Sequence, residues 1–248
     1  MATTFKLALD AGHGLNTWGR RCLKQYDPQE HREWWLNDRI CDYIAEAARQ
    51  YPGLKILRVD DTIGIEGDED IALAIRCKSA NDWGADLYLS IHHNAGINGG
   101  KGGGVTAYSY REGTTGASWR DAFYARIVGA TGLVGNRATP KTTADFSVLI
   151  NTAMPAVLVE HGFMDSPADI PVIISEEVAK AVGYAYMEVI AERVGLEKAA
   201  TKEPEPTPLP SDGYYRVQVG AYKKRENAEA TLAKLKAAGF EDAYIKTT

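Results

Sequence analysis

The feature of this sequence that most limits its fold is the alternation of short apolar runs with segments of helical period. Apolar runs of strand length occupy residues 5–10, 54–59, 86–92, 105–110 and 154–163. Segments whose apolar residues recur at helical spacing occupy residues 30–53, 68–84, 118–130 and 175–195. Strands that alternate with helices favour a parallel sheet covered by helices. We therefore predict an α/β fold, with a twisted and mostly parallel sheet flanked by helices.

The composition of the chain changes after the last predicted helix, whose expected N-cap is Ser175 and whose end is marked by Gly195. Residues 196–212 are rich in proline, lysine and glutamate and have no apolar period, which is typical of a stiff, extended linker. This change predicts a domain at 1–195, a linker at 196–212 and a small C-terminal module at 213–248.

The C-terminal module has the pattern of a strand, a helix and a second strand. Alternation over residues 215–219 predicts the first strand, and the apolar run before the chain end predicts the second. The spacing of Ala228, Leu232 and Leu235 predicts a helix that ends near Gly239. A unit of this size is too small to hold a core by itself.

The charge and cysteine content argue against several classes of protein. The 33 acidic and 28 basic residues give a net charge of −5, which disfavours nucleic acid as the main partner. The three cysteines are widely spaced and form no C-x-x-C pair, so we expect free thiols rather than disulfides or a thiolate zinc cluster. No apolar segment approaches the length that spans a bilayer.

Polar residues suited to catalysis lie at the ends of three predicted strands. His13 follows the first strand, His92 and His93 end the third, and Glu160 with His161 lies near the end of the last. In open α/β sheets, sites form in the crevice outside the carboxyl ends of the strands. We therefore expect these side chains to converge.

Imidazoles and carboxylates that converge in a cleft suit a catalytic zinc ion, which takes three protein ligands and leaves a fourth position for water. A carboxylate outside the ligand set can then accept a proton from the attacking water. The start of the first predicted helix adds Glu30, His31 and Glu33 as candidates. Spacing does not choose among these three, nor between His92 and His93, whose side chains point to opposite faces of a strand.

Four motifs in order carry a resemblance to a known family. They are DAGHG, EWWLN, RCKSANDWGADLYLSIHHNAG and TADFSVLINTAMPAVLVEHGFMD. Over residues 5–194 the sequence resembles the zinc-dependent N-acetylmuramoyl-L-alanine amidases of the Amidase_3 type, which are cell-wall hydrolases of bacteria and phages. The resemblance implies one zinc ion per catalytic domain, held by His13, Glu33 and His92. It makes Glu160 the catalytic acid/base and implies no role for His93 or His161.

Some residues near these motifs keep two interpretations. The segment between His13 and Glu33 is long for the family, so Glu30 stays an alternative ligand and His31 a weaker one. The aromatic side chains of this region suit either sugar stacking or core packing: Trp18, Trp34 and Trp35. The glycine-rich loop at 96–104 suits either the border of a substrate cleft or a plain connection.

The C-terminal module resembles one half of a SPOR-type (sporulation-related) repeat, a peptidoglycan-binding unit. A full module of this type has two strand–helix–strand halves, whereas this chain has one. Because a small apolar unit with an unpaired strand edge invites pairing, we expect two chains to join their half modules in a homodimer.

The resemblance implies a peptidoglycan hydrolase that cuts the amide between the lactyl group of N-acetylmuramic acid and L-alanine of the stem peptide. An endolysin and an autolysin both fit. The alternatives are a zinc peptidase that cuts within the stem peptide and a non-catalytic wall-binding protein. The sequence MATTFKLALDAGHG at the start lacks the pattern of a signal peptide. We therefore expect synthesis in the cytoplasm and action on the cell wall after release by lysis.

Overall fold

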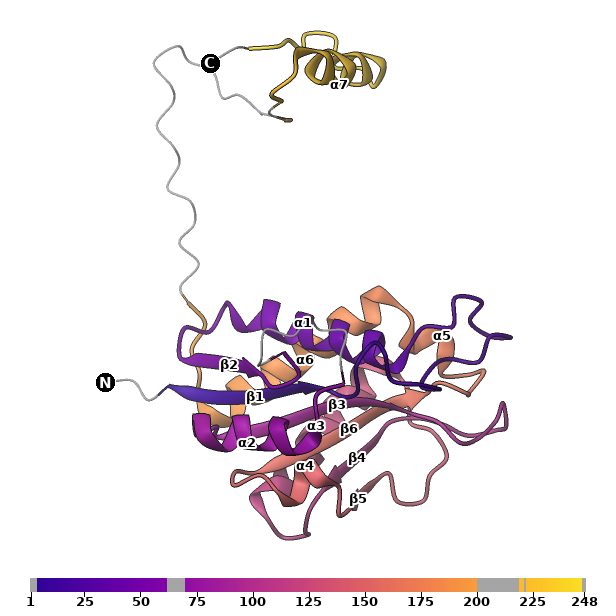
Figure 1. Ribbon diagram of the computed structural model, residues 1–248, viewed down its shortest axis with the longest axis vertical. Helices are drawn as coiled ribbons and strands as arrows, with labels where there is room; N and C mark the ends of the chain where they lie inside the picture. The colour runs from indigo at the N-terminus through magenta and orange to yellow at the C-terminus, as the bar shows by residue number, and fades with distance from the viewer. Residues whose placement is uncertain (1–3, 62–69, 200–218, 221, 247–248) are drawn as a thin grey trace. The chain divides into compact units, whose positions relative to one another are not determined.

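The computed structural model describes residues 4–61, 70–199, 219–220 and 222–246. The chain divides into two compact units, residues 1–199 and 200–248. The first unit contains the sheet and the candidate site, and the second contains one helix (Figure 1). The finer limits, with a linker at 196–212, stay a prediction.

The first unit is built on a six-stranded sheet with the strand order β2-β1-β3-β6-β4-β5. The strands are β1 (Phe5–Ala11), β2 (Leu54–Arg58), β3 (Leu87–Asn94), β4 (Thr106–Ser109), β5 (Lys141–Thr143) and β6 (Ala156–Phe163). β1 pairs in parallel with β2 and β3, as do β3 with β6 and β4 with β5, whereas β4 runs antiparallel to β6. The predicted α/β fold with a mostly parallel sheet is confirmed.

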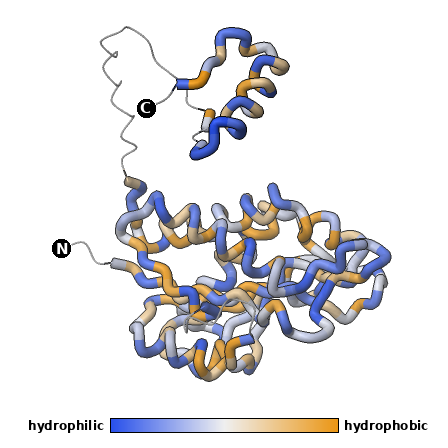
Figure 2. The backbone as a smooth tube through the Cα atoms, turned by 45° about the horizontal axis from the view of Figure 1, so that its top comes forward, coloured by the Kyte–Doolittle hydropathy of each residue, from blue (hydrophilic) through white to orange (hydrophobic). Residues whose placement is uncertain are grey.

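Helices cover both faces of this sheet. They are α1 (Glu33–Ala48), α2 (Leu73–Trp83), α3 (Thr115–Thr131), α4 (Ser147–Ile150), α5 (Ile170–Ile173) and α6 (Glu176–Val194). One core cluster joins one face of β1, β3 and β6 to α1, α3 and α6, and a second joins the other face to α2 and α4. Apolar segments accordingly gather in the middle of the unit (Figure 2).

Alternation along β1 decides which side chains reach which layer. Leu7 and Leu9 pack in the cluster with α1 and α6, whereas Ala8 packs in the cluster with α2. Both leucines are fully buried, and each such side chain contributes about 1.5–3 kcal/mol of hydrophobic stabilisation. The next residue on the α2 side is the buried Asp10, so this face turns polar as the strand ends.

Local signals set most helix ends. The hydroxyl of Ser175 accepts a hydrogen bond from the N–H of Val178 at 3.3 Å, and Gly195 ends α6 with φ +69°, as predicted. α3 begins before the predicted residue 118, because the Thr114 hydroxyl caps it by accepting from the N–H of Ala117. α1 begins at Glu33 rather than at residue 30, since Arg32 is extended (φ −77°, ψ 151°).

The predicted start of the second helix, at residue 68, is wrong. α2 begins at Leu73, and Ala72 before it is extended at ψ 135°. The side chain of Arg76 reaches back to the carbonyl of Ile71 at 2.8 Å and to the carboxylate of Asp70 at 3.1 Å. These contacts hold residues 70–72 outside the helix, where the acidic residues had suggested a first helical turn.

The second unit contains helix α7 (Arg225–Ala237), which confirms the predicted helix. The side chains predicted to form its apolar face, Ala228, Leu232 and Leu235, are half-buried. The second predicted strand is not formed, since residues 239–246 have no strand among them; a strand needs a partner for its backbone groups. The first predicted strand, at 215–219, lies outside the described residues except for Val219. Pairing of two chains through this unit stays a prediction.

No helix among the described residues is both long enough and apolar enough to cross a membrane.

Candidate metal centre

A cleft of about 650 Å³ opens where β1, β3 and β6 end. Ala11 at the end of β1 lies opposite Ile91 of β3, and His92 of β3 lies opposite Glu160 of β6. Because these strands are parallel neighbours, the residues at their carboxyl ends line one space, and the predicted convergence is present in the structure.

His13, Glu33 and His92 form a compact cluster inside this cleft. Their candidate ligand atoms all lie within 4.8 Å of one another. His13 Nε2 is 3.2 Å from Glu33 Oε2, and His92 Nδ1 is 3.0 Å from Glu33 Oε1. The two imidazole rings meet edge to face with their centroids 5.0 Å apart. Two nitrogens and one carboxylate are therefore arranged as a donor set for a cation.

Glu33 is the buried centre of the cluster, with only 1% of its side chain exposed. Burial opposes its ionisation, but the contacts with His13 and His92 outweigh burial and hold the pKa of the carboxyl well below its usual range. The same carboxylate raises the pKa of His92 to about 9, against the effect of burial. The charge state of each of these three side chains therefore depends on the other two.

Each oxygen of Glu33 has a different environment. Oε1 accepts a hydrogen bond from the backbone N–H of His93 at 3.3 Å in addition to its contact with His92. Oε2 is buried and has no hydrogen-bond partner among the described residues, although it lies 3.2 Å from His13 Nε2. Buried polar atoms are rarely left unpaired, so this oxygen is suited to accept a cation as its partner.

Glu160 lines the same cleft without joining the cluster. Its Oε2 is buried and has no hydrogen-bond partner among the described residues. Burial raises the pKa of Glu160 to about 7, although the neighbouring charge of His92 acts in the opposite direction. A carboxyl group with a pKa close to neutral can both accept and donate a proton at physiological pH.

The loop after β1 is held by side chains that bind three consecutive carbonyl groups. Arg76 donates to the carbonyls of Ala11 and His13, both at 2.7 Å, and Asn37 Nδ2 donates to the carbonyl of Gly12 at 3.0 Å. These bonds fix His13 at φ +68°, a left-handed conformation that costs a residue with a side chain about 1–2 kcal/mol. The clamp therefore stabilises the backbone conformation from which the His13 ring approaches Glu33.

Arg76 itself is fully buried, and all of its N–H groups are used. Besides the two carbonyls of the loop, its guanidinium binds Asp10 at 2.6 Å, Asp70 at 3.1 Å and the carbonyl of Ile71 at 2.8 Å. Asp10 also accepts from the Ser90 hydroxyl at 2.7 Å. Burial opposes the charge on both partners, but their mutual attraction lowers the pKa of Asp10 and raises that of Arg76.

His93 points away from the cluster, toward α1. Its Nδ1 is 2.8 Å from Oδ1 of Asn37. Because the Asn37 amide nitrogen already donates to Gly12, its oxygen is the acceptor, and the His93 ring is the donor. His93 thus supports the same asparagine that holds the loop before His13.

His161 also lies on the far side of the sheet, against α6. Its Nδ1 donates to the carbonyl of His92 at 3.0 Å, and its Nε2 lies 2.8 Å from the Tyr186 hydroxyl. Burial lowers the pKa of His161 to about 4, so the ring is neutral and its Nε2 accepts a hydrogen bond from the Tyr186 hydroxyl. His161 therefore supports the backbone of His92.

Comparison with known proteins gives the family. The model of the N-acetylmuramoyl-L-alanine amidase family, Amidase_3, matches residues 7–192. The chain belongs to this amidase family. The SPOR domain model matches residues 197–248, which confirms the resemblance of the C-terminal part.

Relatives include enzymes from bacteria and a phage protein. The sporulation-specific N-acetylmuramoyl-L-alanine amidase of Bacillus subtilis is 28% identical over 97% of this chain and 84% of its own length. The amidase CwlM of Bacillus licheniformis is 33% identical over 72% of this chain and 64% of its own length. The endolysin of Bacillus phage SPP1 is 30% identical over 69% of this chain and 65% of its own length.

Solved structures confirm the amidase fold of the first unit. The catalytic domain of the amidase CwlV from Bacillus (Paenibacillus) polymyxa var. colistinus superposes with a TM-score of 0.67. That similarity covers 78% of this chain and all of that chain, at 22% sequence identity. The amidase from Clostridium difficile 630 gives a TM-score of 0.66 at 23% identity, over 78% of this chain and 98% of its own.

The structure of this amidase separates the rival ligands before α1. Glu30 faces Arg21 and Lys24, at 3.7 and 3.8 Å, rather than the cluster. His31 binds Asp27 through Nδ1 at 2.9 Å and stacks on Trp35. Only Glu33 of the three candidates reaches the two histidines, because it occupies the first turn of α1 where that helix faces β3.

The three tryptophans considered for sugar stacking have different environments in the amidase domain. Trp34 packs against the main core cluster, and Trp35 packs between His31 and Arg39. Trp18 is 90% exposed, so it alone of the three presents its ring to solvent.

The glycine-rich loop at 96–104 is anchored to the amidase domain by backbone hydrogen bonds. Oδ2 of Asp165 accepts from three consecutive N–H groups, those of Gly96, Ile97 and Asn98. Asp169 accepts from the N–H of Gly104 at 2.7 Å. No residue of this loop lines the described cleft, which favours a structural connection over a cleft border.

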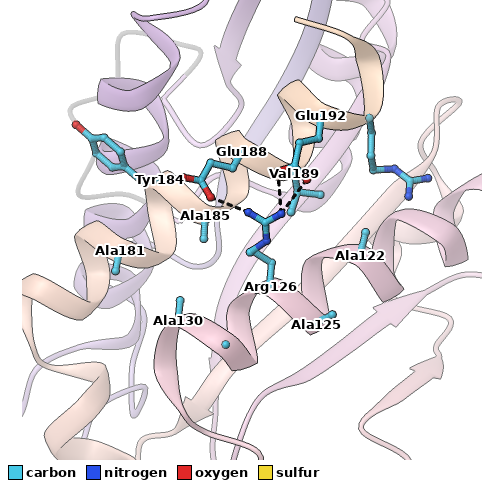
Figure 3. A pocket seen from close by; sticks show the side chains of 12 residues that line it. Ala122, Ala125, Arg126, Ala130, Ala181, Tyr184, Ala185, Glu188, Val189 and Glu192 are labelled. Carbon is cyan, nitrogen blue, oxygen red and sulfur yellow. Dashed lines mark hydrogen bonds and ion pairs between the residues drawn. The ribbon is translucent and has the colours of Figure 1, made fainter. Parts of the chain in front are cut away.

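A second hollow of the amidase domain, about 740 Å³, lies between α3 and α6 (Figure 3). Arg126 of α3 reaches across it to Glu188 at 2.6 Å and Glu192 at 2.8 Å, and most other lining residues are small. The hollow contains no histidine or cysteine, and its two glutamates are paired with Arg126. Among the described residues, the group of side chains arranged to hold a metal ion is that of His13, Glu33 and His92.

Sequence reasoning missed the supporting residues of the amidase site. Asn37 ends the EWWLN motif and Arg76 begins the motif after it, but neither residue was given a role. The signal for Arg76 was an arginine at a position that packs against the sheet, since such a charge must have acidic partners. The matching signal was Asp10, an acidic residue at the end of an apolar strand that could pair with a buried arginine.

Gly12 offers a direct test of the close approach at this site. A Cβ atom there would overlap the His92 ring, with Cε1 as its nearest atom. We expect Gly12→Ala to displace the His92 ring and to weaken zinc binding at least tenfold, measured by competition with a chelator. The control is Gly129→Ala in α3, where nothing lies within 4 Å of the new atom, and zinc affinity should not change. Unchanged zinc affinity in the Gly12 variant would contradict the described packing.

Proposed function

We propose that this chain is a zinc-dependent peptidoglycan amidase, with His13, Glu33 and His92 as metal ligands and Glu160 as the catalytic acid/base. It would cut the amide between the lactyl group of N-acetylmuramic acid and L-alanine. The observation that carries the proposal is the compact donor cluster in the cleft that Glu160 also lines. The family relationship supports the choice of substrate.

The donor set fits zinc on two grounds. Two imidazole nitrogens and one carboxylate oxygen are a ligand set that catalytic zinc uses, with a further position left for water or substrate. The second ground is the buried Oε2 of Glu33, which lies beside the ring of His13 without a hydrogen bond. A cation between them would satisfy both atoms.

Support around the ligands also fits a metal site. The His92 backbone is held by His161, and the backbone of His13 is held by Arg76. Such contacts fix ligand orientation before the metal binds, and their loss in metal sites typically costs 10–100-fold in affinity or activity.

The proposed reaction uses one acidic side chain for two proton transfers. A zinc ion bound by the three ligands would supply polarisation of the amide carbonyl and a lowered pKa for water. Glu160 would accept the proton of the attacking water and then donate it to the departing nitrogen of L-alanine. Its position opposite His92 in the sheet keeps the carboxyl next to the ligands without a direct bond to them.

The C-terminal unit would hold the enzyme at its substrate. The SPOR match supports peptidoglycan binding by residues 197–248. Attachment to the same polymer raises the local concentration of cleavable bonds around the amidase domain.

The paired histidines give a test of the ligand assignment. His92→Ala removes a donor, so the purified variant should lose its zinc, measured by elemental analysis of the protein. His93→Ala should keep one zinc ion per chain but lose about 1–3 kcal/mol of unfolding free energy, because Asn37 loses its buried partner. Loss of zinc from the second variant with retention in the first would reverse the assignment.

The proposed reaction is tested by digesting purified peptidoglycan and identifying the new chain ends. Wild-type protein with zinc should release peptides whose new amino group belongs to L-alanine, and a chelator should abolish this release. Glu160→Gln should retain zinc and lose at least a hundredfold in rate, because it cannot accept a proton.

Other products would assign other activities. New amino groups within the stem peptide would indicate a zinc peptidase, and binding without cleavage would indicate a wall-binding protein. Wild-type activity in Glu160→Gln would overturn the role of Glu160.

A further inference from the structure

The cleft of the donor cluster is lined by two arginines in opposite situations. Arg76 is fully buried, and its N–H groups are all engaged by the protein. Arg20 is exposed, and its guanidinium forms no hydrogen bond or ion pair within the part of the chain that the structure describes. One of the two charges is therefore structural, and the other is available to a ligand.

The position of Arg20 is fixed by its backbone. Its carbonyl accepts the N–H of Glu33 at 2.9 Å, which ties it to the first residue of α1. The neighbouring Arg21 forms a backbone bridge with Arg32, and the Arg32 side chain donates to the carbonyl of Thr17 at 3.1 Å. A long, fully charged side chain is thus presented to the cleft from an anchored segment beside the metal ligands.

Arg20 also acts electrostatically on the catalytic centre. Its charge favours the ionised form of Glu160, against the burial that raises the pKa of that carboxyl. In the proposed function Glu160 transfers protons and Glu33 belongs to the donor cluster. A free guanidinium near them would be costly to leave unpaired once substrate excludes water.

A different part of the cleft lining is apolar. Leu73 and Phe146 line the same cleft and remain 49% and 41% exposed. A ligand that fills the cleft therefore needs apolar groups for these side chains and an anion for Arg20. The muramoyl peptide has both, with methyl groups on its lactyl and alanyl units and carboxylates farther along the stem.

We propose that Arg20 binds a carboxylate of the stem peptide on the alanine side of the scissile amide, and so makes the enzyme selective for stems that keep this group free. The carboxylate is assigned to the residue after L-alanine, which is an isoglutamate or its amidated form, isoglutamine. A guanidinium can form two parallel hydrogen bonds with a carboxylate, but not with a carboxamide. This inference rests on the proposed amidase function.

The test uses two soluble disaccharide-pentapeptides that differ only in this group, a carboxylate in one and a carboxamide in the other. The rate of peptide release by the zinc-loaded wild-type, Arg20→Ala and Arg21→Ala proteins gives kcat/KM for each protein on each substrate. Arg21 is the matched control, because it is paired with Glu30 and does not line the cleft.

We expect the wild type to prefer the carboxylate substrate about tenfold. Arg20→Ala should lose about tenfold on that substrate and stay within about twofold on the carboxamide, while Arg21→Ala stays within twofold on both. An equal loss on both substrates would place Arg20 at the reacting carbonyl instead, and no loss on either would show that Arg20 has no role in substrate binding. Either outcome would overturn this inference and leave the proposed amidase function standing. If wild-type protein frees no L-alanine-terminated peptide from either substrate, the proposed amidase function fails as well.

Discussion

The buried carboxylate of Glu33 is the interaction on which the rest of the site depends. An isolated ionised carboxylate in a protein interior is so unfavourable that it takes up a proton instead. Here two imidazoles and a backbone N–H keep it charged, and one of its oxygens still lacks a hydrogen-bond partner among the described residues. The arrangement is stable only if the histidines stay in place, and a cation between the donors would stabilise it further.

The fold keeps the histidines in place by using both faces of the sheet. His92 and Glu160 face the cleft, while the next residue of each strand, His93 and His161, faces the helices behind it. Each of these two cleft-facing residues is therefore followed by a neutral, hydrogen-bonded histidine that holds the backbone or its neighbours. Arg76 does the same for His13 by linking the end of β1 to the start of α2. A cleft-facing residue and the histidine that supports it are thus neighbours in the sequence.

Much of this architecture could be predicted from the sequence, because the relevant signals are local. Short apolar runs predict the strands, and Ser175 and Gly195 mark the ends of α6. The strand ends single out His13 and Glu160, whereas the family motifs favour Glu33 over Glu30 and His92 over His93, which spacing alone left equivalent. The structure shows which imidazole contacts Glu33, since only a three-dimensional arrangement places α1 across the end of β3.

The failures have a common physical cause in contacts that are distant along the chain. The start of α2 was misplaced because Arg76 binds the residues before the helix as well as the loop after β1. The antiparallel pairing of β4 with β6 follows from the tertiary arrangement and has no local signal. The second strand of the C-terminal unit was expected from its apolar residues, but a strand forms only where its backbone finds a partner.

The proposed metal site requires that His13, Glu33 and His92 bind zinc together. Crystals of the zinc-loaded protein, measured on both sides of the zinc absorption edge, test it most directly. We expect one strong anomalous peak in the cleft, within bonding distance of a ligand atom from each of the three side chains. A peak at His31 and Glu30, or the absence of a peak in a fully loaded protein, would contradict it.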